Sequence, residues 1–92
     1  AMGNVQAAEA RRLLDICQEA GVTLIDTADI YSFGRSEEVI GEALGVQRKD
    51  WILATKVFNR LGPGSNQAGL SRRHIIEACE ASLRRLRTDY LD

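Results

Sequence analysis

Residues 23–31 read TLIDTADIY and residues 51–57 read WILATKV, and these two short stretches decide the fold. Each apolar run stops at a charged side chain, which is Asp26 in the first stretch and Lys56 in the second. Because Asp and Lys are rarely buried unless they are paired, we predict that these two side chains meet at one end of a parallel sheet. Tyr31 lies five residues after Asp26, on the loop that leaves the first strand, and is predicted to reach the same point.

Helical spacing of apolar residues separates the two strands and follows them. In chain order, the sequence predicts a helix from Asn4 to about Ala20, a strand over 22–26, a helix capped by Ser36 and ended by Gly45, a strand over 51–57, a helix capped by Ser71, and the start of a strand over 88–92. The inner face of the last helix is predicted to carry Ile75, Ile76, Cys79, Ser82, Leu83 and Leu86. The long loop 58–69 is a candidate lid.

The alternation of helix and strand predicts an α/β fold with parallel strands joined by right-handed crossovers. Two apolar strands and the start of a third are too few for a parallel sheet, which needs both faces covered. A complete (β/α)₈ barrel takes roughly 250 residues. We therefore predict that residues 1–92 form part of one TIM-barrel domain, in the order helix, strand, helix, strand, helix, start of strand.

Composition excludes several classes of function. The net charge is −1, so no nucleic-acid or membrane partner is indicated. The longest apolar run is too short to span a bilayer, and no signal peptide is visible. Cys17 and Cys79 fall on apolar helix faces, which predicts reduced thiols in a cytoplasmic protein. With no CxxC motif and a single histidine, no metal site is expected.

Three segments together resemble one enzyme family. Residues 21–44, GVTLIDTADIYSFGRSEEVIGEAL, are similar to the segment around the catalytic tyrosine of the aldo-keto reductases. The stretch WILATKV resembles the strand that delivers the family's lysine. Residues 69–92, GLSRRHIIEACEASLRRLRTDYLD, are similar to the branch that holds the potassium-channel β subunits and their bacterial relatives. The resemblance covers nearly the whole chain.

This resemblance implies NADPH-dependent reduction of aldehydes and ketones on a TIM barrel. Tyr31 would be the general acid that protonates the oxygen of a small carbonyl substrate. Lys56 would assist it, because a neighbouring cation favours phenolate and makes proton donation easier. Asp26 would hold Lys56, and Asp26 and Tyr31 would lie near the nicotinamide ribose of NADP(H).

The resemblance also implies an incomplete site within these 92 residues. The family's catalytic histidine would fall a few residues beyond Asp92, and the phosphate- and adenine-binding loops lie on later strands. His74 is predicted to be a surface or helix-start residue and no replacement. We therefore expect this chain alone to self-associate, because its strands and apolar helix faces would otherwise be exposed. We also expect little or no catalysis, and no bound NADP(H), from this chain alone.

Other interpretations stay open at the level of sequence. Asp26 and Lys56 could form a structural ion pair that closes a layer of the barrel. The chain could be a non-catalytic protein that self-associates to cover its strands, or a regulatory or binding module. The basic residues Arg84, Arg85 and Arg87 are predicted to form a solvated helix face. Asp29 lies on the loop after the first strand and could touch a substrate.

Overall fold

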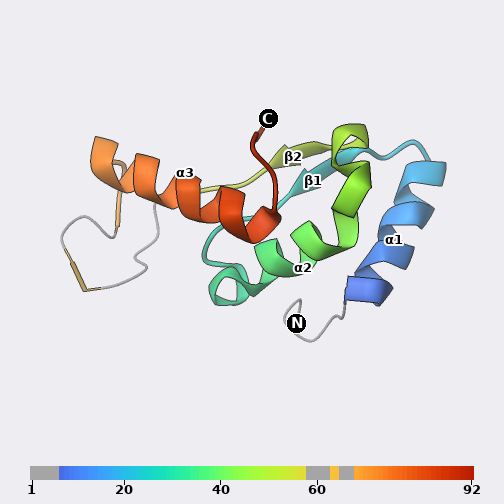
Figure 1. The fold of residues 1–92 in the computed structure, drawn as a ribbon, viewed down its shortest axis with the longest axis horizontal. Coiled ribbons are helices and arrows are strands. Elements are labelled where there is room, and N and C mark those ends of the chain that lie inside the picture. The colour runs from blue at the N-terminus through green and yellow to red at the C-terminus, as the bar shows by residue number, and fades with distance from the viewer. Residues whose placement is uncertain (1–6, 58–62, 65–67) are drawn as a thin grey trace.

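A computed structural model describes residues 7–57, 63–64 and 68–92. Its elements, in order, are α1 (Ala7–Glu19), β1 (Leu24–Asp26), a 3₁₀ helix (Tyr31–Gly34), α2 (Arg35–Leu44), a second 3₁₀ helix (Gly45–Asp50), β2 (Ile52–Ala54) and α3 (Arg72–Leu86) (Figure 1). The predicted alternation of helix and strand is confirmed. The predicted helix start at Asn4 and most of the candidate lid lie outside the described residues.

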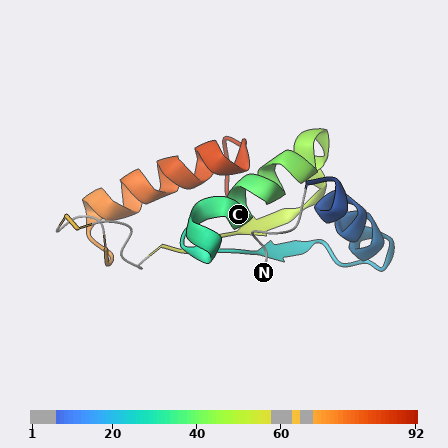
Figure 2. The same cartoon turned by 90° about the horizontal axis from the view of Figure 1, so that it is seen from below.

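The two strands pair in parallel, as predicted, with Leu24 opposite Ile52 and Asp26 opposite Ala54. Both strands are shorter than the sequence predicted, with three residues each. Figure 2 shows α2 and α3 on one side of the strands, with the other face of the sheet uncovered. Leu24 is 58% exposed and Ile52 is 51% exposed on that face. The two strands therefore expose an apolar face, because helices cover only one side of the sheet.

The core lies between the covered face of the sheet and the helices. Its buried residues come from α2, β2 and the ends of their neighbours, and they are Ile40, Leu44, Trp51, Leu53 and Leu86. Leu14, Cys17 and Ile25 pack against this cluster and are partly buried. Burying each large side chain contributes about 1.5–3 kcal/mol relative to leaving it exposed. This core holds β2 against α2 and so positions the carboxyl end of β2.

The buried face of α3 differs from the prediction. It carries His74, Ala78, Ser82 and Leu86, whereas Ile75 and Ile76 are 41% and 40% exposed. The reason is a close approach of α2, since a Cβ added at Gly41 would lie only 2.6 Å from the backbone oxygen of Arg85. A helix contact this close favours small side chains such as Ala78 and Ser82. The prediction of His74 at the helix start is confirmed, but that of a surface position is wrong.

The helix starts agree with the sequence at α3 and differ at α2. Ser71 caps α3, as predicted, and its hydroxyl accepts a hydrogen bond from the backbone N–H of His74. The cap of α2 is Gly34, with φ of 89°, and not the predicted Ser36. Ser36 lies inside the helix, where its hydroxyl hydrogen-bonds to that of Thr27 at 2.9 Å. Because the Ser36 hydroxyl bonds to Thr27, the residue that follows β1, it does not cap the helix.

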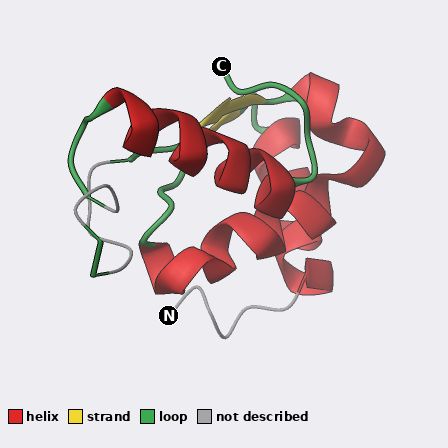
Figure 3. Ribbon diagram, turned by 60° about the vertical axis from the view of Figure 1, so that its left-hand side comes forward, coloured by secondary structure: helices red, strands yellow, loops and turns green. Residues whose placement is uncertain are grey.

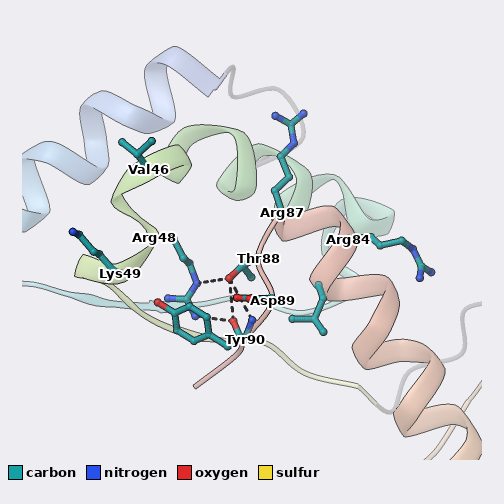
Figure 4. Close-up of a pocket in the computed structure, with 9 residues that line it drawn as sticks. Val46, Arg48, Lys49, Arg84, Arg87, Thr88, Asp89 and Tyr90 are labelled. Atoms are coloured by element: carbon teal, nitrogen blue, oxygen red, sulfur yellow. Dashed lines mark hydrogen bonds between the residues drawn. The ribbon is translucent and has the colours of Figure 1, made fainter.

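Residues 88–92 run back toward β2 without forming the predicted strand (Figure 3). The backbone N–H of Asp92 donates to the oxygen of Leu53, and the Leu53 N–H donates to the Asp92 carboxylate. Arg48 holds this segment, because its guanidinium donates to the backbone oxygen of Tyr90 and to Asp92. Figure 4 shows Arg48 lying against the Tyr90 ring, 3.9 Å from the ring centroid. We call these three residues, Arg48, Tyr90 and Asp92, the arginine clamp.

Within the described part of the chain, no helix is long and apolar enough to cross a membrane. The same residues contain no group of acidic, histidine or cysteine side chains that could hold a metal ion. Cys17 and Cys79 are free thiols, and both are half-buried. This agrees with the prediction that they do not form a disulfide.

Candidate active site

Asp26, Tyr31 and Lys56 lie together just beyond the carboxyl ends of β1 and β2. The Lys56 ammonium is 3.0 Å from the Asp26 carboxylate oxygen Oδ1. It donates hydrogen bonds to the Tyr31 hydroxyl, at 3.2 Å, and to the backbone oxygen of Thr27, at 3.1 Å. We call Asp26, Tyr31 and Lys56 the lysine cluster. The Lys56 ammonium therefore contacts both of the other predicted site residues, Asp26 and Tyr31.

Backbone hydrogen bonds carry the two chain segments past the end of the sheet. The Thr27 N–H donates to the oxygen of Ala54 at 2.9 Å, and the Asp29 N–H donates to the oxygen of Lys56 at 3.2 Å. These bonds continue the strand pairing after β1 and β2 have ended. Beyond them the chain turns into the 3₁₀ helix that begins at Tyr31. The turn brings the phenol back over Lys56, which explains the five-residue spacing from Asp26.

The lysine cluster is open to solvent, and its charge is nevertheless well defined. The hydrogen bond to Asp26, followed by that to Tyr31, raises the pKa of Lys56 above its ordinary value of 10.5. Lys56 is therefore a cation at neutral pH. The side chains of Lys56 and Asp26 are 47% and 60% exposed. An ion pair this exposed contributes little stability, so its main physical effect is to hold the ammonium beside the phenol.

Sequence reasoning missed a buried support behind this cluster. Glu37, in the first turn of α2, is fully buried. One carboxylate oxygen accepts from Arg85 of α3 at 2.7 Å, and the other accepts from the Thr55 hydroxyl at 2.7 Å. The predicted solvated basic face is therefore wrong at Arg85, although Arg84 and Arg87 are exposed. The sequence carries no local signal for this pair, because 48 residues separate its partners.

Asp29 is buried, with only 2% of its surface exposed. Among the described residues, neither of its carboxylate oxygens has a hydrogen-bond partner. Burial, followed by the negative charge of Glu37, raises the pKa of Asp29, while the charges of Arg85 and His74 oppose this shift. The Asp29 side chain is thus a buried acid, and the backbone N–H of Asp29 holds the loop against Lys56.

A tyrosine, a cation and a carboxylate thus lie together at the carboxyl edge of a parallel sheet, which is the edge at which (β/α) barrels place their active sites. A sequence model of the Aldo/keto reductase family matches residues 1–92. The chain belongs to the aldo/keto reductase family.

Curated relatives from plants and bacteria share almost half of their aligned residues with this chain. A probable voltage-gated potassium channel subunit beta from Arabidopsis thaliana is 47% identical over 87 residues, covering 91% of this chain and 26% of the relative. The uncharacterized oxidoreductase YqkF of Bacillus subtilis is 45% identical over 86 residues, covering 91% of this chain and 28% of the relative. The chain thus spans about a quarter of the length of these relatives.

Solved structures agree with the fold. The holo form of aldo-keto reductase AKR11C1 from Bacillus halodurans aligns with a TM-score of 0.78 and 44% identity, over 95% of this chain and 30% of that structure. A putative aldo-keto reductase from Pseudomonas aeruginosa, PA4992, aligns with a TM-score of 0.81 and 38% identity, over 96% and 34%. The described residues therefore have the fold of the corresponding part of an aldo-keto reductase, as the sequence predicted.

Proposed function

We propose that this chain carries the proton-donating part of an NADPH-dependent carbonyl reductase site, with Tyr31 as the general acid. The observation that carries this proposal is the hydrogen bond from the Lys56 ammonium to the Tyr31 hydroxyl oxygen. Because the ammonium donates, the phenol's own proton is not used in this bond and is available to a carbonyl oxygen. Tyr31 is 46% exposed, so a substrate can approach it.

Lys56 and Asp26 have distinct roles in this proposal. As the phenol gives up its proton, negative charge develops on its oxygen, and the ammonium 3.2 Å away stabilises that charge. Tyrosine in water ionises only near pH 10, so it needs such a neighbour to act near neutral pH. Asp26 holds the ammonium at 3.0 Å and keeps it charged. The alternative of a purely structural ion pair does not explain why the phenol joins it.

The residues present fit the reacting end of NADPH. Asp26 offers an exposed carboxylate that can accept from a ribose hydroxyl, and Tyr31 lies beside it through Lys56. When bound, NADPH supplies the hydride that adds to the carbonyl carbon, while Tyr31 supplies the proton to the oxygen. We assign Asp26 and Tyr31 to the nicotinamide end. The phosphate- and adenine-binding parts are proposed to come from the remainder of a barrel.

A second proposal concerns the chain by itself, which we infer self-associates. Leu24 and Ile52 are both more than half exposed on the uncovered face of the sheet. An apolar surface of this kind on a sheet of two strands favours burial against another copy. The free thiols of Cys17 and Cys79 agree with a cytoplasmic location, which we also propose.

A chimera tests the reductase proposal. Residues 1–92 replace the matching part of the Bacillus halodurans reductase, to which they align over 95% of their length. NADPH oxidation is then followed with 4-nitrobenzaldehyde as the probe. We expect reduction by the chimera and a loss of about 10²-fold or more in kcat on Lys56→Met, because the phenol loses its cation. A Lys49→Met chimera is the matched control, and an unchanged rate for Lys56→Met would contradict the proposal.

Calorimetric titration of the 92-residue chain with NADPH, with sedimentation alongside, tests the second proposal. We expect an oligomer without measurable NADPH binding, since the proposed cofactor site is incomplete. A sharp monomeric boundary together with cooperative melting would refute self-association. Saturable binding at micromolar concentration would mean that the assembled copies rebuild the cofactor site, and would contradict the expected lack of binding.

A further inference from the structure

The first turn of α2 touches both chain segments that leave the sheet. Ser36 hydrogen-bonds to Thr27, the residue that directly follows Asp26, at 2.9 Å. The next residue, Glu37, accepts from the hydroxyl of Thr55, the residue that directly precedes Lys56, at 2.7 Å. Two consecutive residues of one helix therefore fix the neighbours of the acid and the base of the lysine cluster.

Glu37 makes this arrangement rigid because its own position is fully determined. A buried carboxylate is costly unless its oxygens are satisfied. Here one oxygen is occupied by Arg85 and the other by Thr55, and the side chain has no exposed surface. α2 also lies close to the end of α3, since a Cβ added at Gly41 would lie only 2.6 Å from the backbone oxygen of Arg85. The Glu37 carboxylate is thus held in one position, and its hydrogen bond holds the Thr55 hydroxyl there.

We propose that Glu37 is a positioning residue, which acts through the Thr55 hydroxyl to hold Lys56 against Tyr31 and Asp26. This inference rests on the proposed function for its catalytic meaning, but its geometry can be tested without turnover. A role in stability alone would need only the Glu37–Arg85 pair, which already joins α2 to α3. The bond to Thr55 adds a direct link from that pair to the residue beside Lys56.

The chain offers an internal reference for the test, because Lys49 and Lys56 are its two lysines. Both are exposed, and they lie at opposite ends of β2. Brief acetylation with acetic anhydride at pH 8 modifies only neutral amines, and mass spectrometry of the peptides gives the ratio of Lys56 to Lys49 modification. The cation held by Asp26, Tyr31 and the Thr27 oxygen should react slowly relative to Lys49 in the parent chain.

We expect Glu37→Gln and Thr55→Val each to raise this ratio by roughly threefold or more, since a tenfold change in neutral amine corresponds to one unit of pKa. Thr55→Ser, which keeps the hydroxyl, should restore the parent ratio. Glu38→Gln is the matched control, because this neighbouring glutamate is half exposed and forms an exposed ion pair with Arg35. Helical circular dichroism checks that each variant is folded, and Thr55→Val leaves the buried ion pair in place if Glu37→Gln unfolds.

An unchanged ratio in folded Thr55→Val would overturn the inference, as would an equal rise in Thr55→Ser. A rise in Glu37→Gln alone would mean that its charge, and not the link through Thr55, governs Lys56, which also contradicts the inference. The same variants in the chimera separate this result from the proposed function. If the ratio changes as expected but the parent chimera reduces no aldehyde, the positioning holds and the reductase proposal fails. If both hold, kcat should fall roughly tenfold or more in Thr55→Val with little change in KM.

Discussion

The lysine cluster and the arginine clamp use the same three kinds of residue at opposite ends of β2. Each contains a cation, a tyrosine and an aspartate: Lys56 with Tyr31 and Asp26, and Arg48 with Tyr90 and Asp92. In the lysine cluster the cation donates to the phenol oxygen, at 3.2 Å, and lies farther from the ring, 5.0 Å from its centroid. In the arginine clamp the guanidinium lies over the ring and bonds the Tyr90 backbone oxygen instead.

Burial separates the two groups further. The Lys56 side chain is 47% exposed, whereas that of Arg48 is 11% exposed and also donates to the oxygen of Trp51. Guanidinium presents several fixed donors and suits a buried clamp, while an ammonium is a compact point charge. In a (β/α) barrel, residues at the carboxyl ends of the strands do the chemistry and those at the other end provide stability. The contacted atoms, more than the residue types, distinguish the two roles.

Replacing the cation of each group should affect the stability of the chain to different degrees. Arg48→Met is expected to lower the free energy of unfolding by about 2–4 kcal/mol, because the backbone oxygens of Trp51 and Tyr90 lose their donor and Asp92 loses its cation. Lys56→Met should leave the unfolding midpoint nearly unchanged, since its ion pair is exposed. Urea unfolding of the two variants and the parent gives both values. Equal destabilisation by the two changes would contradict the division of roles.

The contact between α2 and α3, which holds Arg85 beside Glu37, can be disturbed without changing either group. Gly41→Ala should cost about 1–3 kcal/mol, because the new Cβ meets the backbone of Arg85 and Leu86 at 2.6 to 2.8 Å. Thermal unfolding followed by circular dichroism measures this loss. Glu42→Ala, at an exposed position of the same helix, is the control and should change stability by less than about 0.5 kcal/mol. A neutral Gly41→Ala would mean that the helices are not closely packed there.

Acid and base should affect the two groups separately. The Leu53 N–H, followed by Arg48, lowers the pKa of Asp92, so its contribution is present above the ordinary value of 3.8 and is lost as pH falls through the lowered pKa. The pKa of Lys56 is raised, so its contribution is present below 10.5 and is lost as pH rises through the raised pKa. Hydrogen exchange at the Leu53 amide, corrected for intrinsic rates, should speed up on acidification. Unchanged protection of that amide after the Asp92 carboxyl has been titrated would contradict the role of Asp92.

The sequence was sufficient to predict the lysine cluster, since a carboxylate and a cation each ended an apolar run and Tyr31 followed at loop distance. The parallel pairing followed from the same two runs. The support by Glu37 could not be predicted, because a glutamate in a first helical turn is already explained by the helix dipole. Its burial depends on Arg85 and Thr55, which reach it only through tertiary packing.

The face of α3 shows the same limit. Ile75 and Ile76 mark an apolar stripe in the sequence, but the buried face of α3 carries Ala78 in their place, together with the predicted Ser82 and Leu86. α2 approaches α3 closely at Gly41, and hydrophobic periodicity does not indicate where a neighbouring helix will lie. The uncovered face of the sheet, by contrast, was predictable, because two strands and the start of a third are too few to complete a parallel sheet.

The most direct measurement is aldehyde reduction by the chimera with each tyrosine replaced in turn. With NADPH and 4-nitrobenzaldehyde, Tyr31→Phe should lower kcat by about 10²–10⁴-fold, because the phenolic proton is lost while the ring remains. Tyr90→Phe should keep the parent rate, since Arg48 uses only the ring and the backbone oxygen of Tyr90. A Tyr31→Phe chimera that reduces the aldehyde at the parent rate would contradict the central claim that Tyr31 is the proton donor.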